Sequence, residues 1–450
     1  MKSKGRLFLI CSLILLPVTA FGMEMPDILL EKPRKKLEDK GIVFSTLYTG
    51  DMVSNLKGGL ERKATYVGDV EISLAIDLEK IGLIPGGKIY VSGDDSHGGE
   101  LPTNYVGDFQ TVDNLEAPDA MRLYVWWYEQ SFFKEKLSVL VGAQDLSSEF
   151  AVSRYGNLFI NSSFAIPPDF SMNIPVSYFP YAGLGARIKI KPHEQVEFLA
   201  GIYDGDPTDN GKNRHGVSYR LSSRQGLMAI AEGAYHQKIK FNDRMKPLTG
   251  SVKFGSWLHT QNIDDVLSID ANGSPLAHRN DFGFYGVIDQ MLFREKKDQG
   301  PGAFFCQLLQ IRNPDYDEET EPRGLGAFFQ FGGAPNDRNT VSYYFGAGLN
   351  YTGLVPGRGR DVLGIAVANA FISGRLRESR DREIETFDPA SGGAAPGELR
   401  ANESTLETTY RIRVNDHASL QPDYQIVFNP SGEQNTKTAH VFILRFEIGF

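Results

Sequence analysis

The sequence predicts an all-β fold, an antiparallel transmembrane β-barrel of about 16 strands. Three observations predict it: alternating apolar and polar residues, an export signal at the N-terminus, and no later apolar run of the length that a spanning helix needs. The alternation is clearest in the last twelve residues, 439–450, where Arg445 and Glu447 share one face. The opposite face is wholly apolar: Phe442, Leu444, Phe446, Ile448 and Phe450.

The first residues have the three parts of a secretory signal peptide. A basic start (Lys2, Lys4 and Arg6) precedes the apolar run Leu7–Leu16, and Ala20-Phe21-Gly22 is a small-x-small cleavage site. We therefore expect residues 1–22 to be removed on export.

Charge and cysteine content narrow the function classes. The whole chain has a net charge of −9, and loss of the basic signal peptide makes it more acidic, which argues against nucleic acid as a partner. Cys11 leaves with the signal peptide, so Cys306 has no partner for an intramolecular disulfide and no cysteine cluster remains to bind a metal.

Residues 23–41 are predicted to form an N-terminal periplasmic segment. Glu31–Lys40, with the sequence EKPRKKLEDK, has Pro33 near its first turn and predicts a short helix ahead of the first strand. A solvated cap is favoured over a functional basic patch.

Residues 42–450 are predicted to form the barrel. Alternating runs such as Tyr66–Leu78, Thr405–Val414 and Ser419–Phe428 are separated by clusters of Gly, Asn, Asp and Pro. Their second face carries charges that a dry core does not hold unpaired, which favours a water-filled interior. We expect sixteen strands, near 42–50, 66–78, 87–95, 119–132, 136–146, 183–191, 195–204, 226–237, 249–260, 282–294, 324–332, 340–351, 361–374, 403–414, 417–428 and 438–450.

Short turns alternate with long polar loops, as outer-membrane barrels require. The connection Leu146–Ala182 is long enough to have a function, and an inward fold that narrows the pore and an outward cap are equally compatible with its sequence. Residues 295–323 do not fit a plain barrel, because Ala303–Ile311 resembles a strand within a periplasmic connection.

Several strings resemble the OprB-like carbohydrate-selective porins of Gram-negative outer membranes. They occur in order from about residue 100 to the end, and include RLYVWWYEQ at 122–130, SSEFAVS at 147–153, YDGDP at 203–207, NYTGLVPGR at 350–358 and SLQPDYQ at 419–425. The Trp-Gly-Gly string usual in that family before the first strand is absent. The resemblance implies an outer-membrane porin of the bacterial cell that passes mono- and small oligosaccharides by passive diffusion, without catalysis or a cofactor.

A filter for sugars needs planar groups with several donors or acceptors, together with an aromatic surface. Four residues are predicted to form it: Arg122, Trp126, Glu149 and Arg154. Arg122, Tyr124, Trp126 and Tyr128 share one face of a strand, which is assigned to the lumen because Arg122 is costly in lipid. Asp69 and Glu71 are predicted as secondary charges on the wall. For any single aromatic, including Trp127, a place in the interfacial girdle is favoured.

Other functions remain open at this point. A general diffusion porin without sugar preference is the main alternative, followed by a lipid hydrolase that uses His236, His259 or His440 and by a structural or adhesion barrel. No metal site is predicted, since Asp204, Asp206 and Asp209 depart from the EF-hand spacing.

The expected partners are sugars and outer-membrane lipid. The terminal Phe450 resembles the signal read by the outer-membrane assembly machinery, and the protein is expected to be a monomer or a homotrimer.

Overall fold

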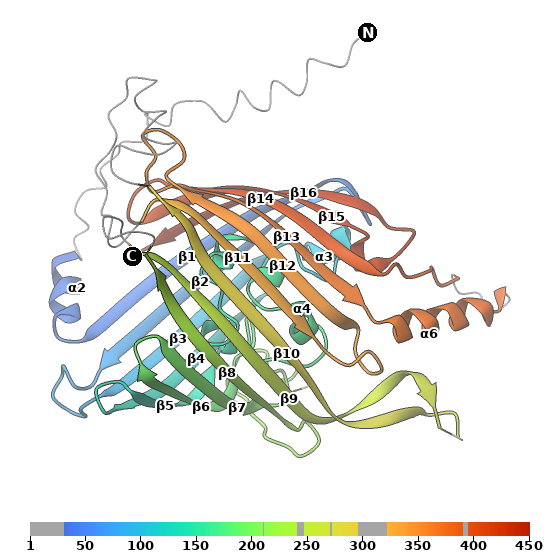
Figure 1. Ribbon diagram of the computed structural model, residues 1–450, viewed down its shortest axis with the longest axis horizontal. Helices are drawn as coiled ribbons and strands as arrows, with labels where there is room; N and C mark the ends of the chain where they lie inside the picture. Colours follow the sequence, from blue (N-terminus) through green and yellow to red (C-terminus); the bar gives the residue numbers. More distant parts are fainter. Residues whose placement is uncertain (1–30, 210, 241–246, 271, 296–321, 390–394) are drawn as a thin grey trace, which may run out of the picture.

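The computed structural model describes residues 31–450 except 210, 241–246, 271, 296–321 and 390–394. Within these residues, sixteen antiparallel strands form one closed barrel, in which each strand pairs with its neighbours in sequence and β1 pairs with β16 (Figure 1). The strands are β1 (Ile42–Gly59), β2 (Ala64–Asp77), β3 (Gly87–Gly98), β4 (Ala120–Phe132), β5 (Leu137–Gln144), β6 (Gly183–His193), β7 (Val196–Asp204), β8 (Leu227–Ile239), β9 (Leu248–Ile269), β10 (Pro275–Arg294), β11 (Gly324–Gly333), β12 (Val341–Thr352), β13 (Val362–Ile372), β14 (Asn402–Arg413), β15 (Ala418–Phe428) and β16 (Lys437–Gly449).

All sixteen predicted strands are confirmed, and three of them extend at least seven residues beyond a predicted end. β1 continues to Gly59, and the β9–β10 hairpin extends through Ile269 and Pro275. The extended hairpin projects from the barrel in Figure 1. Segments outside the bilayer need no apolar face, so alternation did not reveal them. The predicted signal peptide and the strand-like Ala303–Ile311 lie outside the described residues.

The helices are short and lie in the connections. The helix predicted before the first strand is present as α2 (Glu31–Glu38), and α6 (Gly374–Glu385) begins after Ser373, whose hydroxyl accepts a hydrogen bond from Leu376 N. None of the helices in the described part of the chain is long and apolar enough to cross a bilayer. The others are α3 (Thr103–Val106), α4 (Pro168–Ser171) and the 3₁₀ turns η2 (Leu146–Ser148), η3 (Gly156–Leu158), η4 (Ser162–Phe164) and η6 (Pro430–Gly432).

The two faces of the wall differ as the alternation predicts. Ile202, Phe254 and Phe282 project outward and are 53–57% exposed, as lipid-facing side chains are in the absence of lipid. On β16, Phe442 and Ile448 are exposed while Arg445 is buried. Arg445 binds Asp51 on β1 at 2.7 Å, so its charge joins the first and last strands on the inner face.

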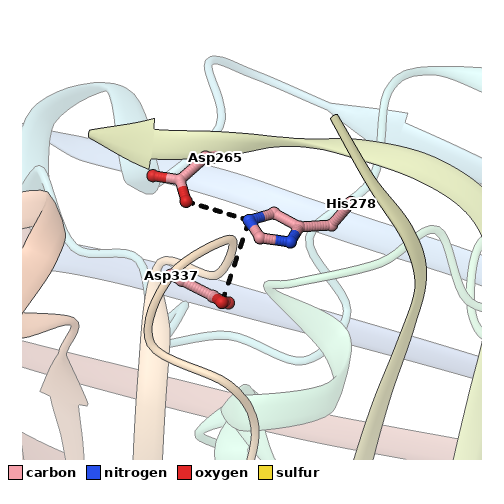
Figure 2. Close-up of side chains that lie close together, drawn as sticks. All are labelled: Asp265, His278 and Asp337. Carbon is pink, nitrogen blue, oxygen red and sulfur yellow. Dashed lines mark hydrogen bonds and ion pairs between the residues drawn. The ribbon is translucent and has the colours of Figure 1, made fainter. Parts of the chain in front are cut away.

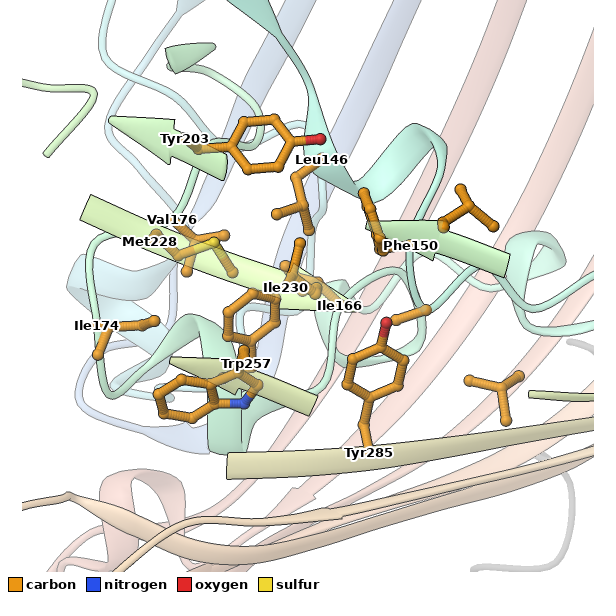
Figure 3. Packing of buried hydrophobic residues seen from close by; sticks show 14 residues of the cluster. Leu146, Phe150, Ile166, Ile174, Val176, Tyr203, Met228, Ile230, Trp257 and Tyr285 are labelled. Carbon is orange, nitrogen blue, oxygen red and sulfur yellow. The ribbon is translucent and has the colours of Figure 1, made fainter. Parts of the chain in front are cut away.

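The interior is narrowed by the connection between β5 and β6, residues 145–182, which folds into the barrel. The inner apolar cluster of Figure 3 joins this connection to the inner face of β7–β10. In it, Phe170 stacks on Trp257 at 5.4 Å and Phe150 meets Tyr203 edge to face. Of the two alternatives left open by the sequence, the structure has the inward one.

Candidate functional site

Carboxylates on the barrel wall hold the inward connection in place. Asp289 on β10 accepts hydrogen bonds from Ser153 Oγ (2.8 Å), Arg154 N (3.1 Å) and Tyr155 N (3.0 Å). Glu407 on β14 accepts two more from the backbone N–H groups of residues 160 and 161, at 2.6 and 3.1 Å. Backbone donors that lie away from water need acceptors, and the wall supplies them. The connection is thereby fixed across the lumen.

A second connection, residues 99–119, also folds inward, and Arg122 supports it. Arg122 faces the lumen as predicted, but its side chain is buried, with 3% of the residue exposed. Its guanidinium donates to Ser96 Oγ at 2.9 Å and to the carbonyl oxygens of Pro118 and Ala120. Its Nη1 and Nη2 groups are therefore already used in positioning the end of the connection.

Asp69 and Glu71 lie on the luminal face of β2, as predicted. Asp69 accepts a hydrogen bond from Ser96 Oγ at 2.9 Å and is buried. Glu71 accepts one from the Tyr90 hydroxyl at 3.1 Å. Glu71 therefore belongs to the wall of the passage, and Asp69 belongs to the hydrogen-bonded group around Arg122.

The prediction that Trp126 shares the luminal face with Arg122 is wrong. In the β3–β4 pair, Gly93 lies opposite Leu123 and Val91 lies opposite Trp126. One residue separates the two positions on β3 but two separate them on β4, so β4 has one extra residue, a β-bulge. Such a bulge exchanges the two faces of all following residues. Trp126 lines an apolar hollow on the outer side with Val91, and its indole N–H donates to Tyr219 at 3.2 Å.

Trp127 takes the luminal position instead. Its ring stacks on Tyr90 at 5.4 Å with an interplanar angle of 19°, and the Tyr90 hydroxyl donates to Glu71. The next luminal residue, Glu129, pairs with Arg187 on β6 at 3.0 Å. The bulge is set by pairing with β3 and leaves no mark in the sequence of β4, so sequence reasoning missed Trp127.

Glu149 follows η2 on the inward connection and ends in a charged cluster. Arg187 binds it at 2.6 Å and Lys189 at 3.0 Å. Both cations come from β6, where they alternate with Ile188 and Ile190, which are about half exposed on the outer face. This alternation is visible in the sequence and could have found the two cations.

Arg154 is the predicted filter residue that the structure leaves most accessible. Its side chain is exposed inside the barrel, donates to Thr249 Oγ1 at 3.3 Å, and lies over the ring of Tyr155 with Cζ 5.5 Å from the centroid. Two cavities of about 210 and 310 Å³ flank the pair, and both are lined by Arg154 and Tyr155. The arrangement presents a planar cation and an aromatic ring to solutes in the lumen.

One acid of the inward connection, Asp169, is fully buried. Neither carboxylate oxygen of Asp169 in α4 meets a hydrogen-bond partner among the described residues. Burial raises the pKa of Asp169 to about 8. Burial therefore favours the neutral form of this carboxyl group.

Asp265, His278 and Asp337 form a small group where the β9–β10 hairpin meets the β11–β12 connection (Figure 2). His278 Nε2 lies 2.9 Å from Asp265 and 3.8 Å from Asp337. Arg338 binds Asp337 at 2.8 Å and lowers the pKa of that carboxyl, while Arg375 lies 3.4 Å from Asp265. Two arginines already balance the two carboxylates, so the group fits an ion-pair network better than a site for a divalent cation.

Two of the histidines considered for a hydrolase are engaged otherwise. His259 Nε2 is 2.8 Å from the carbonyl oxygen of Gly205, and His440 Nδ1 is 2.8 Å from the Tyr424 hydroxyl. Neither contact is the serine–histidine pair that acyl transfer requires.

Comparison with known proteins agrees with this architecture. Residues 61–450 match the family described as carbohydrate-selective porin, OprB family. Porin B of Pseudomonas aeruginosa is 22% identical over 429 residues, covering 93% of this chain and 89% of that protein. The putative porin QuiX of Acinetobacter baylyi is 22% identical, covering 93% and 91%.

Solved structures share the fold. The high-pH structure of Pseudomonas putida OprB superposes with a TM-score of 0.77 at 21% identity, covering 93% of this chain and 96% of that one. The low-pH structure of the same protein gives 0.55 at 17% identity, covering 93% and 95%. With a closed sixteen-stranded barrel, a lumen narrowed by inward connections and a family match over most of its length, this chain belongs to the OprB family of carbohydrate-selective porins of the bacterial outer membrane.

Proposed function

We propose that the protein passes mono- and small oligosaccharides by passive diffusion, and that its filter lies between Arg154 on the inward connection and the Trp127–Tyr90 stack on the wall. The observation that carries the proposal is the exposed guanidinium of Arg154 over the Tyr155 ring, between two cavities. A guanidinium offers several hydrogen-bond donors to hydroxyl groups, and aromatic rings cover the apolar faces of a sugar.

The other predicted filter residues have different roles in this proposal. Glu149 lines the passage with its partners Arg187 and Lys189. Glu71 is a wall charge beneath the aromatic stack, whereas Arg122 and Asp69 position the connection at 99–119. A buried arginine whose terminal nitrogens already donate to the protein contributes through geometry and not through contact with the solute.

Two adjacent tryptophans provide a matched test. In liposome swelling with a panel of neutral sugars, amino acids and organic acids, Trp127→Leu reduces the rate for sugars relative to other solutes of similar size. Trp126→Leu, on the outer face, leaves that ratio as in the wild type. Equal effects of the two substitutions would remove the stack from the filter. A flat response of the wild type across the panel would favour a general diffusion porin.

We also propose the remaining assignments for the whole chain. Residues 1–22 are a signal peptide, 23–41 a periplasmic segment, and 42–450 the barrel. Assembly depends on the terminal Phe450, lipid surrounds the outer face, and the protein acts as a monomer or a homotrimer. The family is one of channels and not of enzymes, so no catalytic residue is assigned.

A further inference from the structure

The passage beside Arg154 is basic on both sides. The cavity of about 210 Å³ brings Arg154 together with Arg411 on β14. The cavity of about 310 Å³ brings it together with Lys238 and Lys253, on β8 and β9. Solutes that pass Arg154 therefore meet further cations from two parts of the wall.

Arg411 forms no direct ion pair within the described residues. It shares the luminal face of β14 with Glu407 and Thr409, which are buried, but its own side chain is only half-buried and its guanidinium forms no hydrogen bond or ion pair there. Glu447, an acid of the same region of the wall, attracts Arg411 electrostatically but forms its hydrogen bond with Ser419. A half-buried cation without a direct ion pair favours an anion from solution.

Few carboxylates of the protein line the two cavities beside Arg154. Among the described residues, no acid lines the cavity shared by Arg154 and Arg411. Asp289 lines the other cavity, but three donors of the inward connection already occupy it. These donors are neutral and leave the negative charge of Asp289 in place, so the two cavities together have four cations, Arg154, Arg411, Lys238 and Lys253, against one acid among the described residues.

A neutral polar group completes the site. Asn350 lines the same cavity, is 6% exposed, and uses its Nδ2 to donate to Tyr155 O at 2.7 Å. Its Oδ1 has no partner among the described residues. A buried acceptor without a donor is costly unless a ligand supplies one, and a sugar hydroxyl is such a donor.

We propose that Arg154 and Arg411 form a subsite for the carboxylate of acidic sugars, and that the pore passes aldonates or uronates in preference to neutral sugars of the same size. This inference rests on the proposed function and names its solute class. The carboxylate binds the two guanidinium groups, while a hydroxyl group donates to Asn350. Because the site is open to water, the attraction is weak enough for the solute to leave again.

The test compares gluconate with glucose, which have the same number of carbon atoms, by uptake into proteoliposomes held at zero membrane potential. At low ionic strength, the wild type takes up gluconate faster than glucose. Arg411→Gln lowers the gluconate-to-glucose ratio by about threefold or more, and Arg411→Lys retains most of it. Salt at 1 M lowers the ratio in the wild type, since it screens charges at this distance. Arg382→Gln, at an exposed ion pair with Glu378 on α6, is the matched control and keeps the wild-type ratio.

The outcomes separate this inference from the proposed function. If glucose permeates well but gluconate is no faster, or if Arg411→Gln leaves the ratio as it was, the acidic subsite is refuted and the sugar channel stands. If neither solute exceeds protein-free liposomes, the proposed function itself fails. A heat-modifiability gel verifies that each variant forms the barrel.

Discussion

Replacing Asp289 by alanine tests the role of wall carboxylates in holding the inward connection. The substitution removes the acceptor of three hydrogen bonds, from Ser153 Oγ, Arg154 N and Tyr155 N. A donor left without a partner costs about 1–3 kcal/mol when it is buried. Because cavities reach this segment and water replaces part of the loss, we expect local destabilisation of about 2–4 kcal/mol in total. Glu232 and Glu407 still hold the flanking residues, so the barrel remains folded.

The assay is hydrogen exchange of the Arg154 and Tyr155 amides, combined with single-channel recording. A local loss of about 2–4 kcal/mol makes exchange of these amides roughly 30-fold to 1,000-fold faster. The current becomes noisier, since the segment moves within the lumen. Asp281→Ala is the control, because Asp281 lies on the same strand but accepts hydrogen bonds from Asn339 and Phe282 N. Unchanged exchange at both amides in Asp289→Ala would refute the role of this carboxylate.

Three further predictions concern other parts of the molecule. Asp169→Asn flattens the pH dependence of stability: below its ordinary pKa of 3.8 the acid is protonated in both states, whereas between there and the folded pKa of about 8 only the unfolded state loses the proton. The wild type therefore loses stability as pH rises through this window, by about 4 kcal/mol at pH 7. Denaturant unfolding at pH 4.5 and 7.5 should show a fall in the free energy of unfolding that the variant lacks. An equal change in wild type and variant would contradict the assignment. Deleting Phe450 removes two backbone hydrogen bonds with Thr46 on β1 and the stacking of its ring on His417 in the β14–β15 connection. Insertion into the outer membrane therefore falls, while the relative permeation of sugars in the protein that does insert is retained; normal assembly would count against this prediction. Arg122→Gln leaves the carbonyl groups at Pro118 and Ala120 without their donor, so it lowers thermal stability by about 1–3 kcal/mol; an unaltered melting temperature would show that the buried guanidinium is dispensable.

Predictions from the sequence were most accurate where the pattern within a single strand decides which side chains face lipid. Alternation along β16 predicted which side chains face lipid, and the exposed Phe442 and the buried Arg445 agree. These predictions were least accurate at Trp126, where a single bulge in the β3–β4 pairing inverted the faces of the strand. The pairing partner decides such a bulge, and no pattern within β4 reveals it.

The candidate site was predictable only in part for the same reason. Arg154 and Glu149 were named from the length and chemistry of the connection at 146–182, but its inward direction depends on acceptors placed far away in sequence. Asp289 and Glu407 lie more than 130 residues from the segment that they hold. Their roles are invisible until the barrel closes and brings them to the lumen.

The sequence by itself determined the class of this protein, because lipid on one side and water on the other impose a two-residue period on every strand. It also determined the number of strands and the residues that are too polar to face lipid. Tertiary structure alone decided what fills the barrel. The direction of the inward connections, the luminal place of Trp127 and the meeting of Arg154 with Arg411 all depend on contacts between distant strands, and such contacts are set by closure and register.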